Sequence, residues 1–111
     1  MNKLKIKLSI LFLFFSSFIF AQSDTLKILT SAECGPCKKK IEKELSFEKG
    51  VKKVTVDLDT KIATVVYLKD KTNADKIRVA ISKIGYDADT VPADKKAYDR
   101  LPDCCKKDGM K

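Results

Sequence analysis

The apolar residues in the central part of the chain follow two different periods in turn, and this alternation limits the fold more than any other feature. Residues 25–29 alternate apolar and polar side chains, as expected of a strand. Ile41 and Leu45 then recur at helical spacing, and Pro36 suits the first turn of a helix because its missing N–H is not needed there. The pattern predicts a strand and a helix joined by a short loop at residues 30–33.

A second set of elements follows after Gly50. Residues 51–58 alternate as a strand, and the β-branched segment at residues 62–68 follows so closely that the two predict an antiparallel hairpin. A second helix is predicted by an apolar stripe at helical spacing, formed by Ile77, Ala80, Ile81 and Ile84. Gly85 ends that helix, and a short strand is predicted from Tyr86 to Val91.

The order strand, helix, strand, strand, helix, strand is that of the ferredoxin-like βαββαβ fold, which belongs to the α+β class. It predicts a four-stranded antiparallel sheet with two helices on one face. With 44% hydrophobic residues in 111, the chain can bury one small core. We expect one domain at residues 23–91, followed by a polar C-terminal tail at residues 92–111 that lies outside it.

The first residues have the composition of a secretory signal peptide, predicted at residues 1–21. Lysines precede an apolar run from Leu8 to Phe20, and the small residue Ala21 follows. The run is shorter than the ~20 apolar residues that span a bilayer, so we expect the mature form not to span a membrane. The protein is therefore expected to be exported, most simply to the periplasm. Its basic residues are not clustered with stacking aromatics, and we expect no nucleic-acid partner.

Cys34 and Cys37 stand at the predicted junction of loop and helix, where both sulfurs can point at one ion. Thiolates prefer soft metals, and two visible ligands favour an open, exchangeable site over a closed structural zinc site. Cu(I) or Hg(II) is the favoured ion, with Zn(II) or Cd(II) as alternatives. The chain has no histidine, which excludes imidazole sites and histidine-dependent nucleophilic catalysis. No other catalytic group stands out, and we expect a protein that is not an enzyme.

The sequence resembles the heavy-metal-associated domain family, which includes copper chaperones and the periplasmic mercury-binding protein. The resemblance covers residues 25 to about 91. It rests on the segment Cys34-Gly35-Pro36-Cys37, on Gly50-Val51 before the hairpin and on Gly85-Tyr86. It implies metal binding through both cysteines, with Tyr86 in the loop near the metal. It also implies thiolate exchange with a metal-transporting membrane protein or another thiol-bearing carrier. We expect the protein to be a monomer.

Two alternatives remain open for the first pair of cysteines. The Gly-Pro between them is also found in thioredoxins, which makes a dithiol/disulfide exchange protein the main alternative. Against this, the chain has no tryptophan, and too few residues precede Cys34 for the elements that thioredoxins place there. A purely structural disulfide is the other alternative.

Cys104 and Cys105 are adjacent in the predicted tail. They are interpreted as auxiliary metal ligands, as partners for the first pair, or as a link to another chain, in that order. Surface thiols without a function are the remaining interpretation, although exposed thiols in an oxidising compartment seldom stay unmodified.

Overall fold

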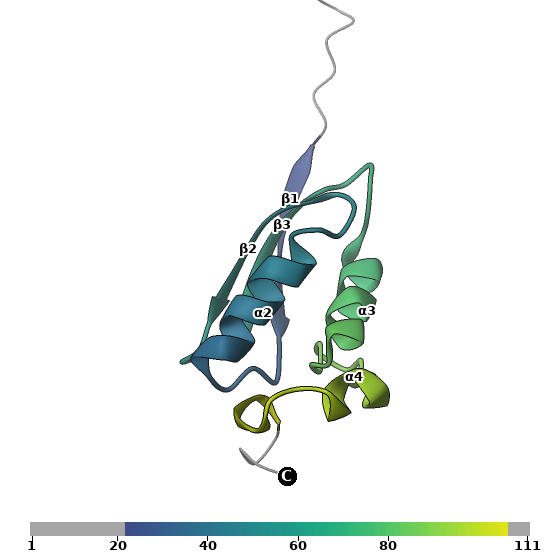
Figure 1. Ribbon diagram of the computed structural model, residues 1–111. Coiled ribbons are helices and arrows are strands. Elements are labelled where there is room, and N and C mark those ends of the chain that lie inside the picture. The colour runs from purple at the N-terminus through teal and green to yellow at the C-terminus, as the bar shows by residue number, and fades with distance from the viewer. Residues whose placement is uncertain (1–21, 107–111) are drawn as a thin grey trace, which may run out of the picture.

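The computed structural model describes residues 22–106 (Figure 1). The predicted signal peptide lies outside these described residues, as do residues 107–111. The elements, in chain order, are β1 (Ser23–Leu29), α2 (Gly35–Leu45), β2 (Val51–Asp57), β3 (Ile62–Leu68), α3 (Ala74–Ile84), α4 (Lys95–Asp99) and the short 3-10 helix η1 (Asp103–Cys105).

The sheet has three antiparallel strands in the order β1-β3-β2, so β3 lies at its centre. Val65 of β3 pairs with Leu26 on one side and with Val54 on the other. Alternate residues of β3 are buried, because successive strand side chains point to opposite faces. Helices α2 and α3 lie on the same face of the sheet (Figure 1). The predicted α+β class and the pair of helices are thus confirmed.

The core lies between this sheet face and the two helices. Its largest fully buried side chains include Ile28, Ile41, Leu45, Val65, Ile77, Ile81 and Tyr86. They are the residues at strand and helix spacing in the sequence, and burying each aliphatic side chain stabilises the fold by roughly 1.5–3 kcal/mol. This packing fixes α2 against the sheet and therefore fixes the start of α2, where the first cysteine pair lies.

The prediction of a fourth strand from Tyr86 to Val91 is wrong for the described residues. Within residues 22–106 this segment forms only isolated bridges, from Ala88 to Thr30 and from Ala88 to Val91. The chain reverses at Asp89, whose φ of 54° is left-handed. The Asp89 carboxylate accepts a hydrogen bond from Leu29 N at 2.9 Å, where a strand would offer a backbone carbonyl. A side chain thus takes over part of the pairing at this edge of β1, and the sheet has three strands.

The segment after Pro92 also differs from the expectation, because it packs on the domain instead of lying outside it. Ala97, Leu101 and Cys105 are buried, at 4%, 4% and 1% exposure. These residues recur every four positions, so one side of the segment is apolar enough to be buried. A β-carbon at Gly85 would meet the backbone of Ala97 at 3.1 Å, which shows how closely the segment approaches the end of α3.

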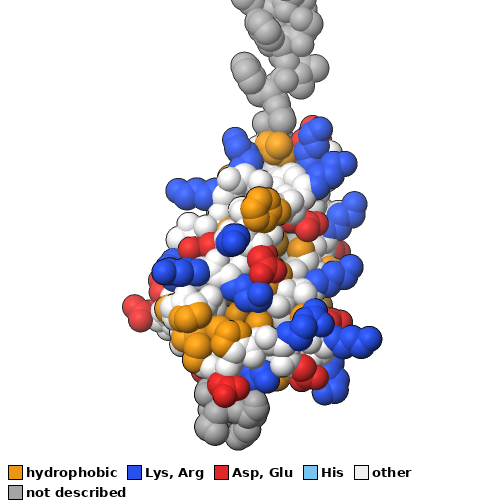
Figure 2. Space-filling model, viewed as in Figure 1, with side chains coloured by type: hydrophobic (Ala, Val, Ile, Leu, Met, Phe, Trp, Pro, Cys, Tyr) orange, Lys and Arg blue, Asp and Glu red, His pale blue; other side chains and the backbone are white. Residues whose placement is uncertain are grey.

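The surface carries mixed charge. Figure 2 shows lysine and arginine side chains spread around the outline of one face, with acidic side chains between them. In the part of the chain that the structure describes, none of the helices has both the length and the apolar character needed to cross a membrane.

Replacing Asp89 tests the turn that ends the sheet. Asp89→Ala is expected to lower the free energy of unfolding by about 2 kcal/mol, because it removes the acceptor for Leu29 N and puts alanine in the left-handed region. Asp89→Asn keeps an acceptor and tolerates that backbone conformation, so it should cost less than about 1 kcal/mol. Urea unfolding at neutral pH measures both. Equal losses for the two variants would contradict this account.

The difference in stability between the wild type and Asp89→Asn is expected to depend on pH. A hydrogen bond from Arg78 Nε at 2.8 Å lowers the pKa of Asp89 below its ordinary value of 3.8, and the bond from Leu29 N acts in the same direction. Because the folded pKa is depressed, the ion pair stabilises the fold above pH 3.8 and this stabilisation is lost as the pH falls through the folded pKa. The advantage of the wild type over Asp89→Asn should shrink accordingly in urea unfolding, and a difference constant with pH would exclude this role.

Candidate metal centre

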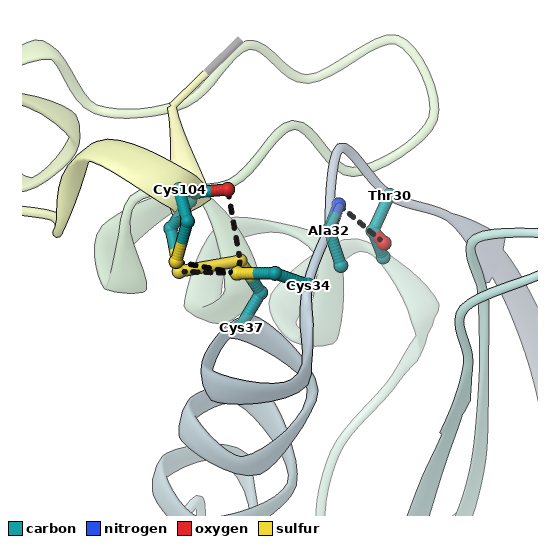
Figure 3. Close-up of a disulfide and its surroundings, with 6 residues drawn as sticks. Thr30, Ala32, Cys34, Cys37 and Cys104 are labelled. Atoms are coloured by element: carbon teal, nitrogen blue, oxygen red, sulfur yellow. Dashed lines mark hydrogen bonds between the residues drawn. A yellow bond between two sulfur atoms is a disulfide. The ribbon is translucent and has the colours of Figure 1, made fainter. Parts of the chain in front are cut away.

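The start of α2 positions the first two cysteines. Cys34 precedes the helix in an extended conformation, and proline stands in the first turn, where its missing N–H is not needed. Cys37 faces the core and is fully buried, whereas Cys34 is partly exposed. Their sulfur atoms lie 2.8 Å apart (Figure 3). The structure therefore brings together the two residues that the sequence predicts as metal ligands.

The C-terminal segment brings the other two cysteines to the same place. Cys34 Sγ lies 2.8 Å from Cys104 Sγ and 3.4 Å from Cys105 Sγ. Cys37 and Cys105 form a disulfide, and Cys34 and Cys104 are free thiols (Figure 3). All four cysteine sulfurs thus belong to one cluster at the N-terminal end of α2, although the two pairs are far apart in the sequence.

The loop between β1 and α2 is held by Thr30. Its hydroxyl donates to the carbonyl of Lys61 at 2.8 Å and accepts a hydrogen bond from Ala32 N at 3.2 Å (Figure 3). Ser31 Oγ accepts a hydrogen bond from Asp87 N at 2.9 Å, which ties the loop to the segment after α3. From the sequence, residues 30–33 are predicted only to form a loop. Hydroxyl side chains directly after a strand are the signal that could have indicated this local turn.

Tyr86 is fully buried, and its hydroxyl has no hydrogen-bond partner among the described residues. Burial raises the pKa of this phenol far above its ordinary value, and negative charge on Cys34 and Cys104 raises it further. The hydroxyl therefore keeps its proton at any physiological pH. It is a buried donor whose charged neighbours are Cys34, Cys104 and Glu44.

Two of the lysines that follow Cys37 pair with acidic side chains of the same helix. Lys38 Nζ donates to Glu42 and to the carbonyl of Val56 at 2.8 Å, and Lys40 Nζ pairs with Glu44 at 2.7 Å. Their charges are thus held one turn further along α2. The positive end of the α2 dipole lies beside the sulfurs instead.

The chemistry of the cluster fits a soft metal ion. Its donors are all cysteine sulfurs, and the donor atoms of Cys34, Cys104 and Cys105 lie within 4.8 Å of one another. Sulfur donors select soft ions such as Cu(I), Zn(II) and their heavier relatives. Because Cys37 is bonded to Cys105, binding by the Cys34 and Cys37 pair requires that this disulfide first be reduced.

Removing the Tyr86 hydroxyl is expected to stabilise the metal-free protein. A buried polar group without a partner costs about 1–3 kcal/mol, and phenylalanine keeps the ring while removing that group. Tyr86→Phe should therefore raise the free energy of unfolding by about 1 kcal/mol in urea. Tyr67→Phe, at a more accessible tyrosine (9% exposed), serves as the control and should change it little. A loss of stability in Tyr86→Phe would show that the hydroxyl has a partner in solution.

Comparison with known proteins identifies the family of this domain. Residues 31–87 match the family model described as "Heavy-metal-associated domain". A copper-exporting P-type ATPase of Staphylococcus aureus (strain JH9) is 43% identical over 60 residues, which are 54% of this chain and 8% of the ATPase. The chain thus spans a small fraction of the length of these curated relatives.

Two solved structures are similar over nearly their whole length. "CopZ metallochaperone" is 27% identical with a TM-score of 0.56, and the alignment covers 59% of this chain and 98% of that one. Oxidized MerP from Ralstonia metallidurans CH34 is 28% identical with a TM-score of 0.58, over 60% of this chain and 94% of the other. The predicted resemblance is confirmed: this chain belongs to the heavy-metal-associated domain family.

Proposed function

We propose that this protein is an exported carrier or scavenger of a soft metal ion, which it binds through the thiolates of Cys34 and Cys37. The observation that carries the proposal is the 2.8 Å separation of the two sulfurs at the positive end of α2. Two thiolates in this position suit ions that accept few ligands, so Cu(I) and Hg(II) are favoured. The family membership and the names of the relatives support a role in metal binding and not in catalysis.

A metal-transporting membrane protein is the proposed partner. The copper-exporting ATPase contains a region similar to this chain, so both proteins would present a comparable loop and helix. An ion held by two thiolates can pass between such loops by stepwise exchange of one sulfur at a time, which needs no third component. Export to the periplasm is part of the proposal and rests on the composition of residues 1–21.

Dithiol/disulfide exchange is the second candidate. It is favoured by one observation: the free thiol of Cys34 lies 2.8 Å from a sulfur of the Cys37–Cys105 disulfide. A thiolate next to a disulfide is the arrangement from which exchange proceeds. The family membership supports metal binding over this alternative.

A metal titration tests the proposal. The chain without its predicted signal peptide is reduced under anaerobic conditions and titrated with Cu(I), Hg(II) and Zn(II) against a competing chelator. We expect tight one-to-one binding of Cu(I) or Hg(II). The double variant Cys34→Ser/Cys37→Ser should lose more than the ~100-fold in affinity that removal of an outer-shell partner costs, because it removes two ligands.

Lys39→Ser is the matched control, since it places serine at an exposed position of the same helix. It should leave the affinity unchanged. Absence of metal binding in the wild type, together with reduction of a disulfide substrate that depends on Cys34, would replace the metal carrier with the exchange protein.

A further inference from the structure

We propose that the C-terminal segment completes the metal site, so that the reduced protein holds its ion with four sulfurs: Cys34, Cys37, Cys104 and Cys105. The inference rests on the proposed function and extends it. Two sulfurs suit Cu(I) or Hg(II), whereas four also suit ions that need tetrahedral thiolate coordination, namely Zn(II) and Cd(II). The segment would thereby supply within one chain the sulfurs that a partner would otherwise provide.

The sulfurs of the four cysteines already lie close together. Cys34 Sγ lies 2.8, 2.8 and 3.4 Å from the sulfurs of Cys37, Cys104 and Cys105. Four sulfurs at about 2.3 Å from a zinc ion would lie ~3.8 Å from one another. These three separations are shorter by about 0.4–1 Å, and the bonded sulfurs of Cys37 and Cys105 lie closer still until the disulfide is reduced. Reduction followed by a small spread of the sulfurs therefore admits an ion. The Cα atoms of Cys37 and Cys105, 5.5 Å apart, already allow this.

The C-terminal segment is docked on the domain by contacts that do not involve sulfur. Leu101 is buried, and its side chain would lie 3.2 Å from a β-carbon placed on Gly85. Ser82 Oγ donates to the carbonyl of Pro92 at 2.7 Å, and the Ser82 carbonyl accepts a hydrogen bond from Asp94 N at 2.9 Å. Reduction of the disulfide leaves these contacts in place. Cys104 and Cys105 therefore stay beside Cys34 at a high effective concentration.

The hydroxyl of Tyr86 has no hydrogen-bond partner within residues 22–106. It is fully buried, and its electrostatic neighbours include Cys34 and Cys104. Thiolates that bind a metal remain hydrogen-bond acceptors, and outer-shell donors to metal ligands are a regular feature of metal sites. The hydroxyl is an unused buried donor in the same core cluster as Cys37 and Cys105.

The site forms in two chemical steps. A dithiol reductant first transfers two electrons and two protons to the Cys37–Cys105 bond, which breaks into two thiols while the reductant's own sulfurs join as a disulfide. The divalent ion then replaces the protons of the four thiols, which are released to solvent. The metal ion does not change its oxidation state in either step.

Cobalt(II) is the probe for the number of sulfurs, because its charge-transfer absorption grows with each thiolate ligand and its ligand-field bands report tetrahedral geometry. In the reduced chain we expect a tetrahedral spectrum with four thiolates. Cys104→Ser/Cys105→Ser should show about half the charge-transfer intensity and lose more than the ~100-fold in Zn(II) affinity that removal of an outer-shell partner costs, because it removes two ligands. Its Cu(I) affinity should fall by no more than about tenfold, since Cys34 and Cys37 remain.

Lys96→Ser, at an exposed position of α4, is the matched control and should keep the full spectrum. Circular dichroism of each variant checks that the fold is retained. Equal cobalt spectra for the wild type and Cys104→Ser/Cys105→Ser would overturn the four-sulfur site. The proposed function would remain intact if Cys34→Ser/Cys37→Ser had lost its affinity for Cu(I). If that last variant binds Cu(I) as tightly as the wild type, both the proposed function and this inference are wrong.

Discussion

The arrangement of the sulfurs depends on the hydrogen bonds that Thr30 makes. Its backbone N–H and its hydroxyl both donate to the Lys61 carbonyl at 2.8 Å, and its hydroxyl also accepts from Ala32 N. One residue thus joins the end of β1, the turn of the hairpin and the loop that leads into α2. Because Ala32 is fully buried, the loop has little freedom before Cys34. The start of α2 is therefore held in a fixed position above the core.

The spacing of the apolar residues is sufficient to predict most of the fold. Ile41 and Leu45 of α2, and Ile77 and Ile81 of α3, are fully buried as their spacing indicates. The fourth strand could not be predicted in the same way. Asp89 turns the chain and satisfies Leu29 N with its side chain. Strand propensity shows only that aspartate is unfavourable in a strand. It does not reveal that the Asp89 carboxylate accepts the hydrogen bond that a backbone carbonyl of a fourth strand would accept.

The C-terminal segment shows a different limit of sequence reasoning. Ala97 and Leu101 are spaced for one helical face, yet the segment is short and highly charged, so its burial depends on a complementary surface elsewhere. That surface is the end of α3 at Gly85, whose missing side chain leaves the necessary room. The contact between Cys34 and Cys104, 70 residues apart, follows from this docking and could not be read from spacing alone.

The disulfide between Cys37 and Cys105 also bears on how long the empty protein survives. It closes a loop across a sequence separation of 68 residues, which encloses both long helices and the hairpin. Constraining an unfolded chain by a loop of that size stabilises the folded state by roughly 4 kcal/mol on the chain-entropy account. In the oxidised form the unfolded population exposed to proteases is therefore expected to be smaller than in the reduced form without an ion. Protein turnover would thus remove selectively the molecules that have been reduced but have not captured a metal.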